Sequence, residues 1–384
     1  MTAIDEWLSA AARRRARSST IRTTDPLRHP NGRLLDLASN DYLGLAGDPR
    51  LRDAAAAATA RFGTGAGASR VVTGTTDSHA EAEHELALLT GQPSCLVFSS
   101  GYAANIGILT ALGDPDTLLV SDAHVHASLI DGARLSRSPV EICPHGDLEA
   151  LDRLLRRRTQ PRALVAVESI YSVLGDAPEI GRIAAICAAH DALLIVDEAH
   201  GIGVAGAGRG GVHAAGLAGA EHVVITVTLS KALGAQGGAV LGSSLLREHL
   251  VSTARTFLFD TGLAPAAAAA AAEACRVIAA EPERVDALHR VASRIAEAGG
   301  VERYPGAVQS IPVGSPETAL GAANRLQEEG ILVGCFRPPT VPDGVSRLRL
   351  TARASVDAER AAEAAARAAR HAGALAPAVA GTAW

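Results

Sequence analysis

The sequence predicts an α/β protein in which a large domain, with a mainly parallel sheet flanked by helices, is joined to a smaller α+β domain. Between about residues 50 and 260, short apolar or β-branched runs alternate with amphipathic stretches of helical length. After Pro265 the composition changes to alanine-rich helix and then to short strands. We therefore expect an N-terminal segment (1–45) that packs with the small domain, a large domain (46–265) and a C-terminal small domain (266–384).

The strands expected in the large domain are runs rich in valine, leucine, isoleucine and alanine. They are Cys95–Phe98, Thr117–Ser121, Val140–Cys143, Ala163–Glu168, Ala192–Asp197, His222–Thr228 and Gly238–Gly242. The expected helices between them are Ser78–Leu89, Tyr102–Leu112, Leu148–Arg158 and Glu179–His190. This alternation of strand and helix favours parallel strands with helical crossovers.

The smaller domain is expected to mix helices and strands. An alanine-rich helical region runs to about Gly299, another helix begins at Pro316 and a last helix ends the domain. Short strands are expected at Val308–Val313, Ile331–Phe336 and Ser346–Thr351.

Composition and charge exclude several classes of protein. The 384 residues are 48% hydrophobic and 20% charged, as in an ordinary folded chain. The formal net charge is −5, so no overall basic field exists to attract nucleic acid or an anionic membrane. The apolar run Ala264–Ala272 is far shorter than the roughly 20 residues that span a bilayer. We expect small molecules and other protein surfaces as partners, with no nucleic acid and no membrane.

The five cysteines indicate a reducing, cytoplasmic environment. Their number is odd, they are widely scattered and no C-x-x-C pair occurs, so neither a disulfide framework nor a zinc ribbon is expected. The N-terminal residues also lack the apolar core of a secretory signal.

Polar residues follow several predicted strands, at the edge where open parallel sheets bind ligands. One strand ends directly in Asp197, which is followed by Glu198 and His200. A nucleotide-hydrolysing site is excluded because it needs a lysine within a G-x-x-x-x-G-K-[ST] loop, which the chain lacks. Asp197 is then either a structural carboxylate or the partner of a protonated ring nitrogen in a cofactor.

The chain contains a single lysine, Lys231, among 36 basic residues. It follows a predicted strand, and Thr228, Ser230 and Gly234 beside it suit a phosphate. Only an amine can bond covalently to a carbonyl carbon as an imine, because a guanidinium stays protonated and delocalised. An exposed lysine without function is the alternative.

Two further segments carry candidate ligand contacts. Gly101 and Tyr102 open a helix, where free N–H groups suit an anion and the aromatic ring could lie beside a flat ligand; a plain strand-to-helix turn is the alternative. His124 and His126 follow the next strand, but no cluster of further ligands accompanies them, so a metal is not expected. One imidazole stacked on a ring, or a helix-capping histidine, fits better.

Together, Asp197, His200 and Lys231 resemble the pyridoxal-phosphate site of fold-type I enzymes. Along nearly its whole length the chain is similar to the α-oxoamine synthase family. The matching segments are Ser39–Leu45, Gly63–Arg70, Thr73–Thr75 with His79 and Glu83, Ser99–Tyr102, His124–Gly132, Asp197–Gly201 and Thr228–Gly234.

The resemblance implies catalytic and cofactor-binding roles for residues of these motifs. Lys231 would anchor the cofactor covalently and move protons, Asp197 would pair with the pyridinium nitrogen, and His200 with the phenolic oxygen. His126 would stack on the ring beside the substrate. The remaining implied cofactor contacts are Gly101, Tyr102, Ser172 and Thr228, with Thr261 reaching the phosphate of a neighbouring subunit in a homodimer with shared sites.

The implied substrate contacts are Arg22, Asn40, Thr340 and Arg349. The segments Arg337–Pro342 and Arg347–Leu350 are most similar to the members that condense L-alanine with a pimeloyl thioester, carried on coenzyme A or a carrier protein, with loss of carbon dioxide during biotin biosynthesis. Members that use glycine, of the aminoketobutyrate ligase or aminolevulinate synthase type, remain an alternative. A non-catalytic ligand-binding protein of the same fold is another.

Overall fold

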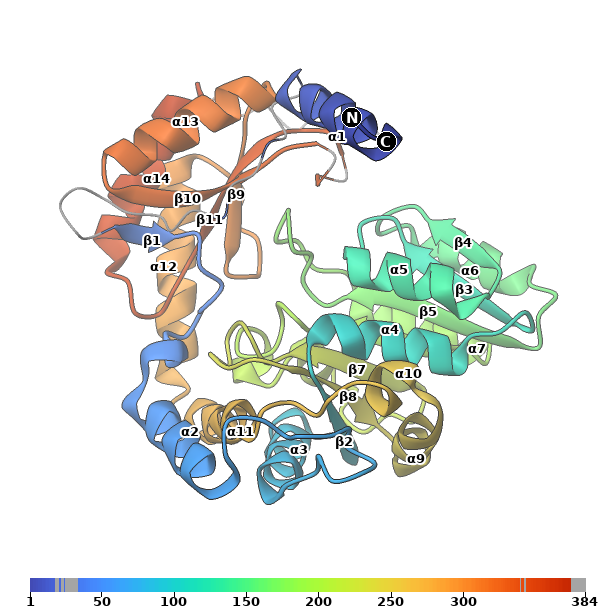
Figure 1. Cartoon of the computed structure of the whole chain (residues 1–384). Helices are drawn as coiled ribbons and strands as arrows, with labels where there is room; N and C mark the ends of the chain where they lie inside the picture. The colour runs from blue at the N-terminus through green and yellow to red at the C-terminus, as the bar shows by residue number, and fades with distance from the viewer. Residues whose placement is uncertain (18–20, 22–23, 25–33, 339, 342, 374–384) are drawn as a thin grey trace.

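The computed structural model describes residues 1–17, 21, 24, 34–338, 340–341 and 343–373. It contains a seven-stranded and a four-stranded sheet, each with its own helices (Figure 1). The large sheet lies to the right in that view, and the small sheet lies at the upper left beside the described N-terminal helix. This arrangement confirms the predicted fold class.

The large sheet has the strand order β2-β8-β7-β6-β5-β3-β4. Only β8 runs against its two neighbours, β2 and β7, so the sheet is mainly parallel as predicted. The strands are β2 (Ser94–Phe98), β3 (Thr117–Asp122), β4 (Val140–Cys143), β5 (Arg162–Glu168), β6 (Leu193–Asp197), β7 (Val223–Thr228) and β8 (Gly238–Gly242). The sequence located each of them to within two residues.

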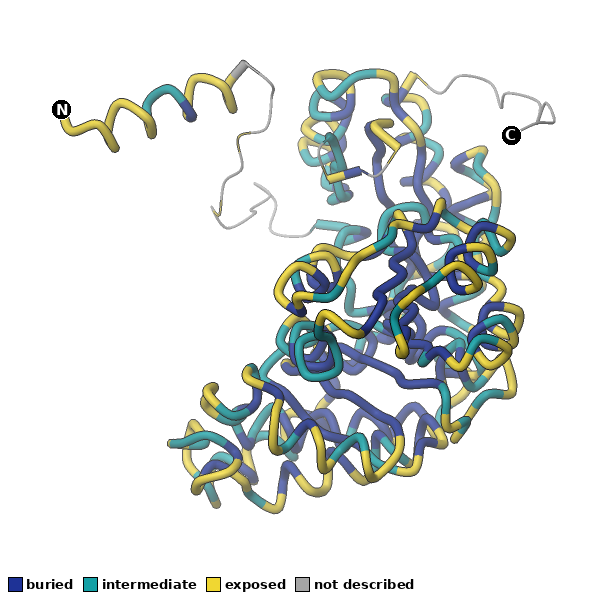
Figure 2. Tube along the Cα trace, turned by 90° about the vertical axis from the view of Figure 1, so that its right-hand side faces the viewer, coloured by how far each residue is buried: buried dark blue, intermediate teal, exposed yellow. Residues whose placement is uncertain are grey.

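Helices cover both faces of this sheet because its central strands are apolar on both sides. One face packs on α4 (Gly101–Leu112), α5 (Ala127–Ser136), α9 (Ser244–Thr253) and α10 (Arg255–Leu258). The other packs on α3 (Asp77–Thr90), α6 (Leu148–Arg156), α7 (Ile180–Ala189) and α11 (Pro265–Ala280). Figure 2 shows the buried strands between helices whose outer sides are exposed.

The small sheet has the order β1-β10-β11-β9, and helices cover it. Its strands are β1 (Leu35–Leu37), β9 (Val308–Pro312), β10 (Ile331–Phe336) and β11 (Arg347–Thr351). The helices α12 (Glu283–Gly299), α13 (Pro316–Glu328) and α14 (Ala358–Ala372) pack against it. The N-terminal strand β1 pairs in parallel with β10.

The domain limits at residues 45 and 265 stay a prediction. Helix α11 packs on α3 and on α2 (Pro49–Phe62), and the chain then passes through α12 to the small sheet. The sequence did not anticipate helix α1 (Ala3–Arg17), α5 or α9. Among these, α5 begins at Ala127, and the preceding residue, His126, caps it because its ring accepts from the N–H of Ser128. Histidine is not among the residues that are strongly preferred as N-caps.

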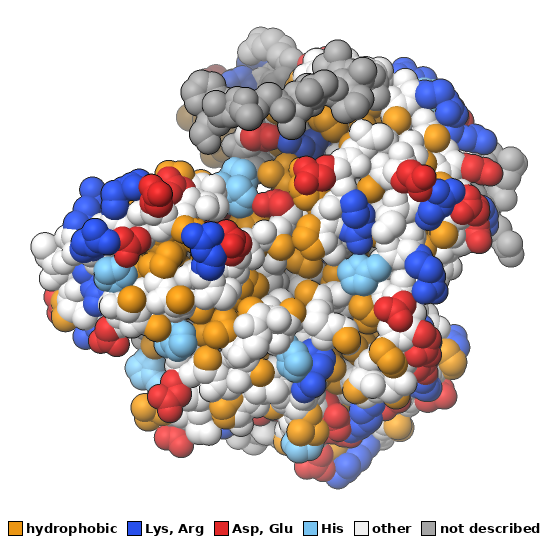
Figure 3. Space-filling view, turned by 180° about the vertical axis from the view of Figure 1, so that it is seen from behind, with side chains coloured by type: hydrophobic (Ala, Val, Ile, Leu, Met, Phe, Trp, Pro, Cys, Tyr) orange, Lys and Arg blue, Asp and Glu red, His pale blue; other side chains and the backbone are white. Residues whose placement is uncertain are grey.

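The surface and the cysteines give two further observations. Acidic and basic side chains are interspersed on the face shown in Figure 3. Within the described part of the chain, no helix combines the length and the apolar character needed to cross a membrane. All five cysteines are free thiols, and four of them are buried.

Candidate active site

A cavity of about 270 Å³ lies at the carboxyl ends of β5, β6 and β7. The register of the sheet places the ends of these strands close together, because Glu168 and Asp197, the last residues of β5 and β6, pair with each other and Asp197 pairs with Thr226, two residues before the end of β7. The lining residues are Ser100, Gly101, Tyr102, Asn105, His126, Ser128, Glu168, Asp197, Ala199, His200, Thr228, Ser230 and Lys231. The chain's single lysine therefore shares a cavity with the predicted aspartate and both predicted histidines.

A line of hydrogen bonds connects Lys231 to Arg349. Lys231 Nζ lies 2.8 Å from His200 Nε2, and His200 Nδ1 lies 2.6 Å from the hydroxyl of Tyr42. That hydroxyl donates to Asn40 Oδ1 at 3.3 Å, and Arg349 donates to the same oxygen at 3.0 Å. Segments more than 300 residues apart in the sequence thus meet at one site.

The donors along this line have one consistent direction. Because Tyr42 donates its only proton to Asn40, its oxygen accepts from His200 Nδ1–H. His200 Nε2 is then the acceptor that faces the amine of Lys231. Burial lowers the pKa of His200 well below its usual value, and the charges of Lys231 and Arg349 lower it further, so the ring is neutral as this direction requires.

The amine of Lys231 is prepared to act as a nucleophile. Burial lowers its pKa from 10.5 to about 8, against the attraction of Asp197 and Glu168. A large share of the side chain is therefore neutral near pH 8, and the neutral amine is the form that attacks a carbonyl carbon.

Asp197 is held by two hydrogen bonds at the end of β6. Its Oδ1 accepts from the N–H of Ala199 at 2.9 Å, and its Oδ2 accepts from Asn105 Nδ2 at 2.7 Å. Asn105 also donates to Ser128 Oγ at 2.8 Å, and its own Oδ1 has no partner among the described residues. The carboxylate is thus fixed in the cavity by α4, with acceptor capacity to spare for a cationic partner.

Glu168 places a second carboxyl group in the same cavity. It is 2% exposed, and its Oε1 has no hydrogen-bond partner within the described part of the chain. Burial and the neighbouring charge of Asp197 raise its pKa well above the usual value. The raised pKa favours the protonated form of Glu168, because two adjacent buried carboxylates repel each other.

Backbone and hydroxyl donors form a cradle at the N-terminus of α4. The Ser100 hydroxyl caps this helix by accepting from the N–H of Ala103, and Thr228 Oγ1 lies 2.8 Å from Ser230 Oγ. A Cβ on Gly101 would lie 2.9 Å from Thr228 Cβ, and a Cβ on Gly238 would lie 2.3 Å from the nitrogen of Gly101. Only glycines permit this close approach, and the free N–H groups of the twelve-residue helix suit a phosphate.

The predicted substrate contacts Asn40 and Arg349 lie together, next to the cavity. Arg349 is 5% exposed on β11, and its Nε is unpaired among the described residues. Its guanidinium lies over the ring of Phe336, 5.2 Å from the ring centre. A buried guanidinium with an unused donor is suited to a carboxylate that arrives with the substrate.

The other predicted residues have various positions. Tyr102 lines the cavity, and its hydroxyl donates to Asp131 at 2.5 Å, with the side chain 45% exposed. Ser172, in the loop after β5, and Thr340, which is exposed, do not line the cavity. Thr261 is exposed and does not line this chain's own cavity, and its contact with a neighbouring subunit stays a prediction. Arg22 lies outside the described residues. The roles predicted for the site residues remain a proposal.

Sequence reasoning missed several residues of the cavity. Ser100, Asn105, Ser128 and Glu168 were given no role, and Ser230 was noted only as suited to a phosphate. Tyr42, which contacts His200 beside the cavity, was noticed only as part of a motif. Asn105 had a usable signal, because it is the one amide in an otherwise small and apolar helix. Glu168 had one as well, since it ends an apolar strand just as Asp197 does.

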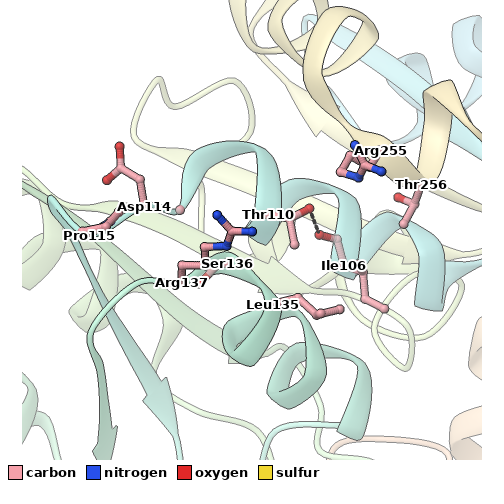
Figure 4. A pocket seen from close by; sticks show the side chains of 10 residues that line it. Ile106, Thr110, Asp114, Pro115, Leu135, Ser136, Arg137, Arg255 and Thr256 are labelled. Atoms are coloured by element: carbon pink, nitrogen blue, oxygen red, sulfur yellow. Dashed lines mark hydrogen bonds between the residues drawn. The ribbon is translucent and has the colours of Figure 1, made fainter.

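A second pocket, of about 640 Å³, runs beside α4 and is larger (Figure 4). Ile106 and Leu135 line it, together with Arg137 and Arg255, and no lysine or histidine does. The hydroxyl of Thr110 donates to the carbonyl of Ile106 within the helix at 2.7 Å and is not available to a ligand. Size alone therefore does not locate the chemistry.

The donor set of the smaller cavity fits pyridoxal phosphate. The amine of Lys231 can bond to the aldehyde carbon, Asp197 can pair with the ring nitrogen, and His126 offers a flat ring. The glycine and hydroxyl cradle at α4 suits the phosphate. The fold and this site define a fold-type I pyridoxal-phosphate enzyme.

Comparison with known proteins narrows this class. The model of the family "Aminotransferase class I and II" matches residues 33–367. The 8-amino-7-oxononanoate synthase of Mycolicibacterium smegmatis is 53% identical over 352 residues, which cover 91% of this chain and 92% of that protein. That of Mycobacterium leprae is 50% identical over 355 residues, covering 92% of both. The chain belongs to the 8-amino-7-oxononanoate synthase family.

Solved structures agree with this assignment. The serine palmitoyltransferase of Sphingomonas wittichii has a TM-score of 0.88 and 28% identity, covering 97% of this chain and 99% of that one. A lysine-to-alanine variant of the serine palmitoyltransferase of S. paucimobilis, with a bound aldimine of pyridoxal phosphate and myriocin, has a TM-score of 0.88 and 27% identity over 98% of this chain and 100% of that one. The 8-amino-7-oxononanoate synthase of Francisella tularensis has a TM-score of 0.76 and 25% identity over 88% and 98%.

Proposed function

We propose that this chain is a pyridoxal-phosphate-dependent acyltransferase that condenses L-alanine with a pimeloyl thioester. The products are 8-amino-7-oxononanoate, carbon dioxide and the free thiol carrier, as in biotin biosynthesis. The activity follows from the family, since relatives that share half of its residues over nine-tenths of its length are 8-amino-7-oxononanoate synthases. The single structural observation that carries the proposal is the line of contacts from Lys231 to Arg349.

The cofactor supplies the electronic part of the chemistry. When bound, pyridoxal phosphate provides an aldehyde carbon that bonds to an amine and a ring that accepts electrons from the neighbouring carbon. Asp197, which is fixed by its contacts with Asn105 and Ala199, would pair with the ring nitrogen and keep it protonated. The imidazole of His126 would lie against the ring.

Arg349 and Asn40 hold the carboxylate of alanine. The guanidinium offers paired N–H donors to the two carboxylate oxygens, and the unused Nε is one of them. With the carboxylate fixed there, Lys231 would be the base that removes the α-hydrogen, because its amine lines the same cavity. His200 Nε2 orients this amine, and the lowered pKa of His200 makes it a weaker base that does not compete for the proton.

Bond making and breaking then follow in order. Cα of alanine bonds to the thioester carbonyl carbon as the carbon–sulfur bond breaks, and the thiolate of the carrier takes a proton from solvent and leaves as the thiol. The carboxylate held by Arg349 departs as carbon dioxide, and Lys231 returns a proton to Cα. The same amine therefore serves as base and as acid, for which a pKa of about 8 is suited.

We also propose a homodimer and a cytoplasmic location. Val72 and Phe259 are 72% and 73% exposed, and the hydrogen bond of 2.9 Å from the N–H of Gly262 to the carbonyl of Ala68 joins their two loops. Exposed apolar residues grouped near Thr261 favour a subunit contact there. The five free thiols favour a reducing compartment. Sedimentation of the active protein as a monomer would contradict the dimer.

A matrix of substrates tests the proposed reaction. The purified protein with pyridoxal phosphate is incubated with L-alanine, glycine or L-serine, and with pimeloyl or palmitoyl thioesters of coenzyme A and of a carrier protein. We expect the 8-amino-7-oxononanoate mass and free thiol in equal amounts from alanine and a pimeloyl donor. Turnover with glycine or serine but not with alanine would indicate the activity of another member of the family. If no pair of amino acid and thioester releases thiol, the proposal that the protein is an enzyme is contradicted.

A further inference from the structure

A half-buried histidine outside the cavity connects the loops that carry predicted cofactor contacts. His145 follows β4, and its Nδ1 lies 2.9 Å from Asp122 Oδ1 while its Nε2 lies 2.8 Å from Asp176 Oδ2. Asp122 ends β3 and Asp176 lies in the loop after β5. One imidazole therefore ties together the loops after three neighbouring strands.

Both ring nitrogens of His145 must donate, because each faces a carboxylate oxygen. Only the imidazolium form has two donors. Burial disfavours the charged form of His145, but the hydrogen bonds that it donates to Asp122 and Asp176 outweigh the burial. Together these effects raise the pKa of His145 to about 9. We call His145 and the carboxylates of Asp122 and Asp176 that it binds the clamp. The imidazole of the clamp is therefore charged at neutral pH.

The two carboxylates balance the positive charge of His145, because the rings that contact it are neutral. The ring of His124 stacks on it at 3.8 Å between ring centres, with 15° between the planes. Burial, and then the charge of His145, lower the pKa of His124, so that ring is neutral. The ring of Tyr171 meets that of His145 edge-on, with 4.5 Å between the ring centres. The charge of Asp343 acts to raise the pKa of His124, and the charge of Glu168 acts to raise the pKa of Tyr171.

The clamp reaches the cavity through short stretches of backbone. Asp122 also accepts from the N–H of His124 at 2.7 Å, only two residues before His126. The backbone carbonyl of Asp176 accepts from the N–H of Tyr171 at 2.8 Å, which closes the loop that contains Ser172. The carboxyl group of Glu168 interacts with the backbone N–H groups of both His126 and Ser172.

The same loop touches the small sheet. The hydroxyl of Ser310, on β9, donates to the carbonyl of Val173 at 2.6 Å. A Cβ on Gly175 would lie 2.4 Å from the carbonyl oxygen of Val308, so this approach requires glycine. Fixing the loop at Asp176 thus also fixes one contact between the two sheets.

We propose that His145 is a positioning residue: by joining the loops after β3, β4 and β5, its imidazole sets the place of His126 in the cavity and of the neighbouring loop that contains Ser172. It does not line the cavity and takes no part in proton transfer there. Its contribution is present at neutral pH and is lost as the pH rises through about 9, because a folded-state pKa raised above 6.5 stabilises the fold only while the group is protonated.

The variant His145→Gln tests this role, with His190→Gln as a matched control. His190 Nε2 also binds an aspartate, Asp152 Oδ1 at 2.7 Å, and its side chain is 19% exposed against 24% for His145. Affinity of the cofactor-free protein for pyridoxal phosphate is measured by absorbance between pH 7 and 10, without alanine or thioester, so the result does not depend on the proposed substrates.

We expect H145Q to bind the cofactor about tenfold more weakly at pH 7.5 and to lack the part of the wild-type decline that is centred near pH 9. H190Q should match the wild type. If H145Q does not fold, Asp176→Asn, which keeps the side chain's shape, is measured in its place, with weaker binding expected. Affinity and pH dependence equal to those of H190Q would overturn the proposal, and so would a ring-nitrogen NMR signal of His145 that titrates near 6.5.

Discussion

Two buried polar networks of this protein differ in how completely their groups are paired. In the first, all three nitrogens of the Arg70 guanidinium donate, to Thr75, Val97 and Glu83, and both oxygens of Glu83 accept. In the second, around Lys231, buried atoms of Glu168, Asn105 and Arg349 lack partners among the described residues. Buried polar groups are normally paired. Unpaired buried atoms also occur elsewhere, as at Gln92, but those of Glu168, Asn105 and Arg349 gather at or beside one cavity and so indicate a ligand site.

The comparison also separates two kinds of cost. Breaking the paired network leaves an uncompensated charge in the interior and destabilises the fold. Changing the unpaired network removes interactions that are completed only with cofactor and substrate, so activity falls while stability does not. Each prediction below assigns a residue to one side of this division.

The largest effect is expected for Lys231→Arg. Arginine keeps the positive charge but cannot bond to an aldehyde carbon, so turnover should fall on the order of 1,000-fold or more. Thiol release and the thermal unfolding midpoint are measured together. A variant that keeps more than a tenth of wild-type turnover would remove Lys231 from the chemistry.

Glu83→Gln should produce the opposite pattern. It removes one charge from between Arg70 and Arg247, whose nitrogens lie 2.9 and 3.0 Å from the Glu83 oxygens. We expect a loss of about 3 kcal/mol in the free energy of unfolding. The rate per folded molecule should stay within twofold of the wild type, and a selective loss of kcat in well-folded protein would break the comparison.

Arg349→Lys should act on the substrate alone. Lysine keeps the charge but loses the planar pair of donors, so the KM for alanine should rise about 30-fold, while the cofactor affinity stays unchanged. Steady-state kinetics over a range of alanine concentrations measure the KM for alanine, and a separate cofactor titration measures the cofactor affinity. Unchanged KM would place the alanine carboxylate elsewhere.

The smallest expected effect is a shift in pH dependence. The neutral amine of Lys231 captures the cofactor, so the capture rate of cofactor-free protein should rise with pH and level off above about 8. Because the charge of Arg349 lowers this pKa, Arg349→Met should move the midpoint upward. Stopped-flow absorbance measures both, and a midpoint near 10.5 in the wild type would show an unperturbed amine.

The sequence predicted the sheet well because its strands are apolar on both faces and are separated by glycine, proline and polar turns. It also brought together Asp197, His200 and Lys231, since each follows a strand at the same edge. It could not reveal that Tyr42 and Asn40 link His200 to Arg349, because those contacts join β11 to the N-terminal region across the two sheets. Hydrogen-bond partners so distant along the chain leave no local pattern.

The difference between the networks was likewise invisible in the sequence. Glu83 and Glu168 are both buried glutamates near strands of the large sheet, at 8% and 2% exposure. The structure shows how they differ. Glu83 accepts hydrogen bonds from Arg70, Arg247 and the backbone N–H of Val97. Glu168 instead lines the cavity beside Asp197. Pairing, and not residue type or burial, distinguishes a structural charge from a functional one.

Reductive trapping tests the central claim most directly. Lys231 is the only lysine, so the N-terminal amine is the one competing site for a covalent bond to the cofactor aldehyde. Protein loaded with pyridoxal phosphate is treated with borohydride, digested and analysed by mass spectrometry. We expect one cofactor per chain, on the peptide that contains Lys231, and none in Lys231→Arg. A label on the N-terminus alone, or undiminished labelling of the variant, would contradict the account.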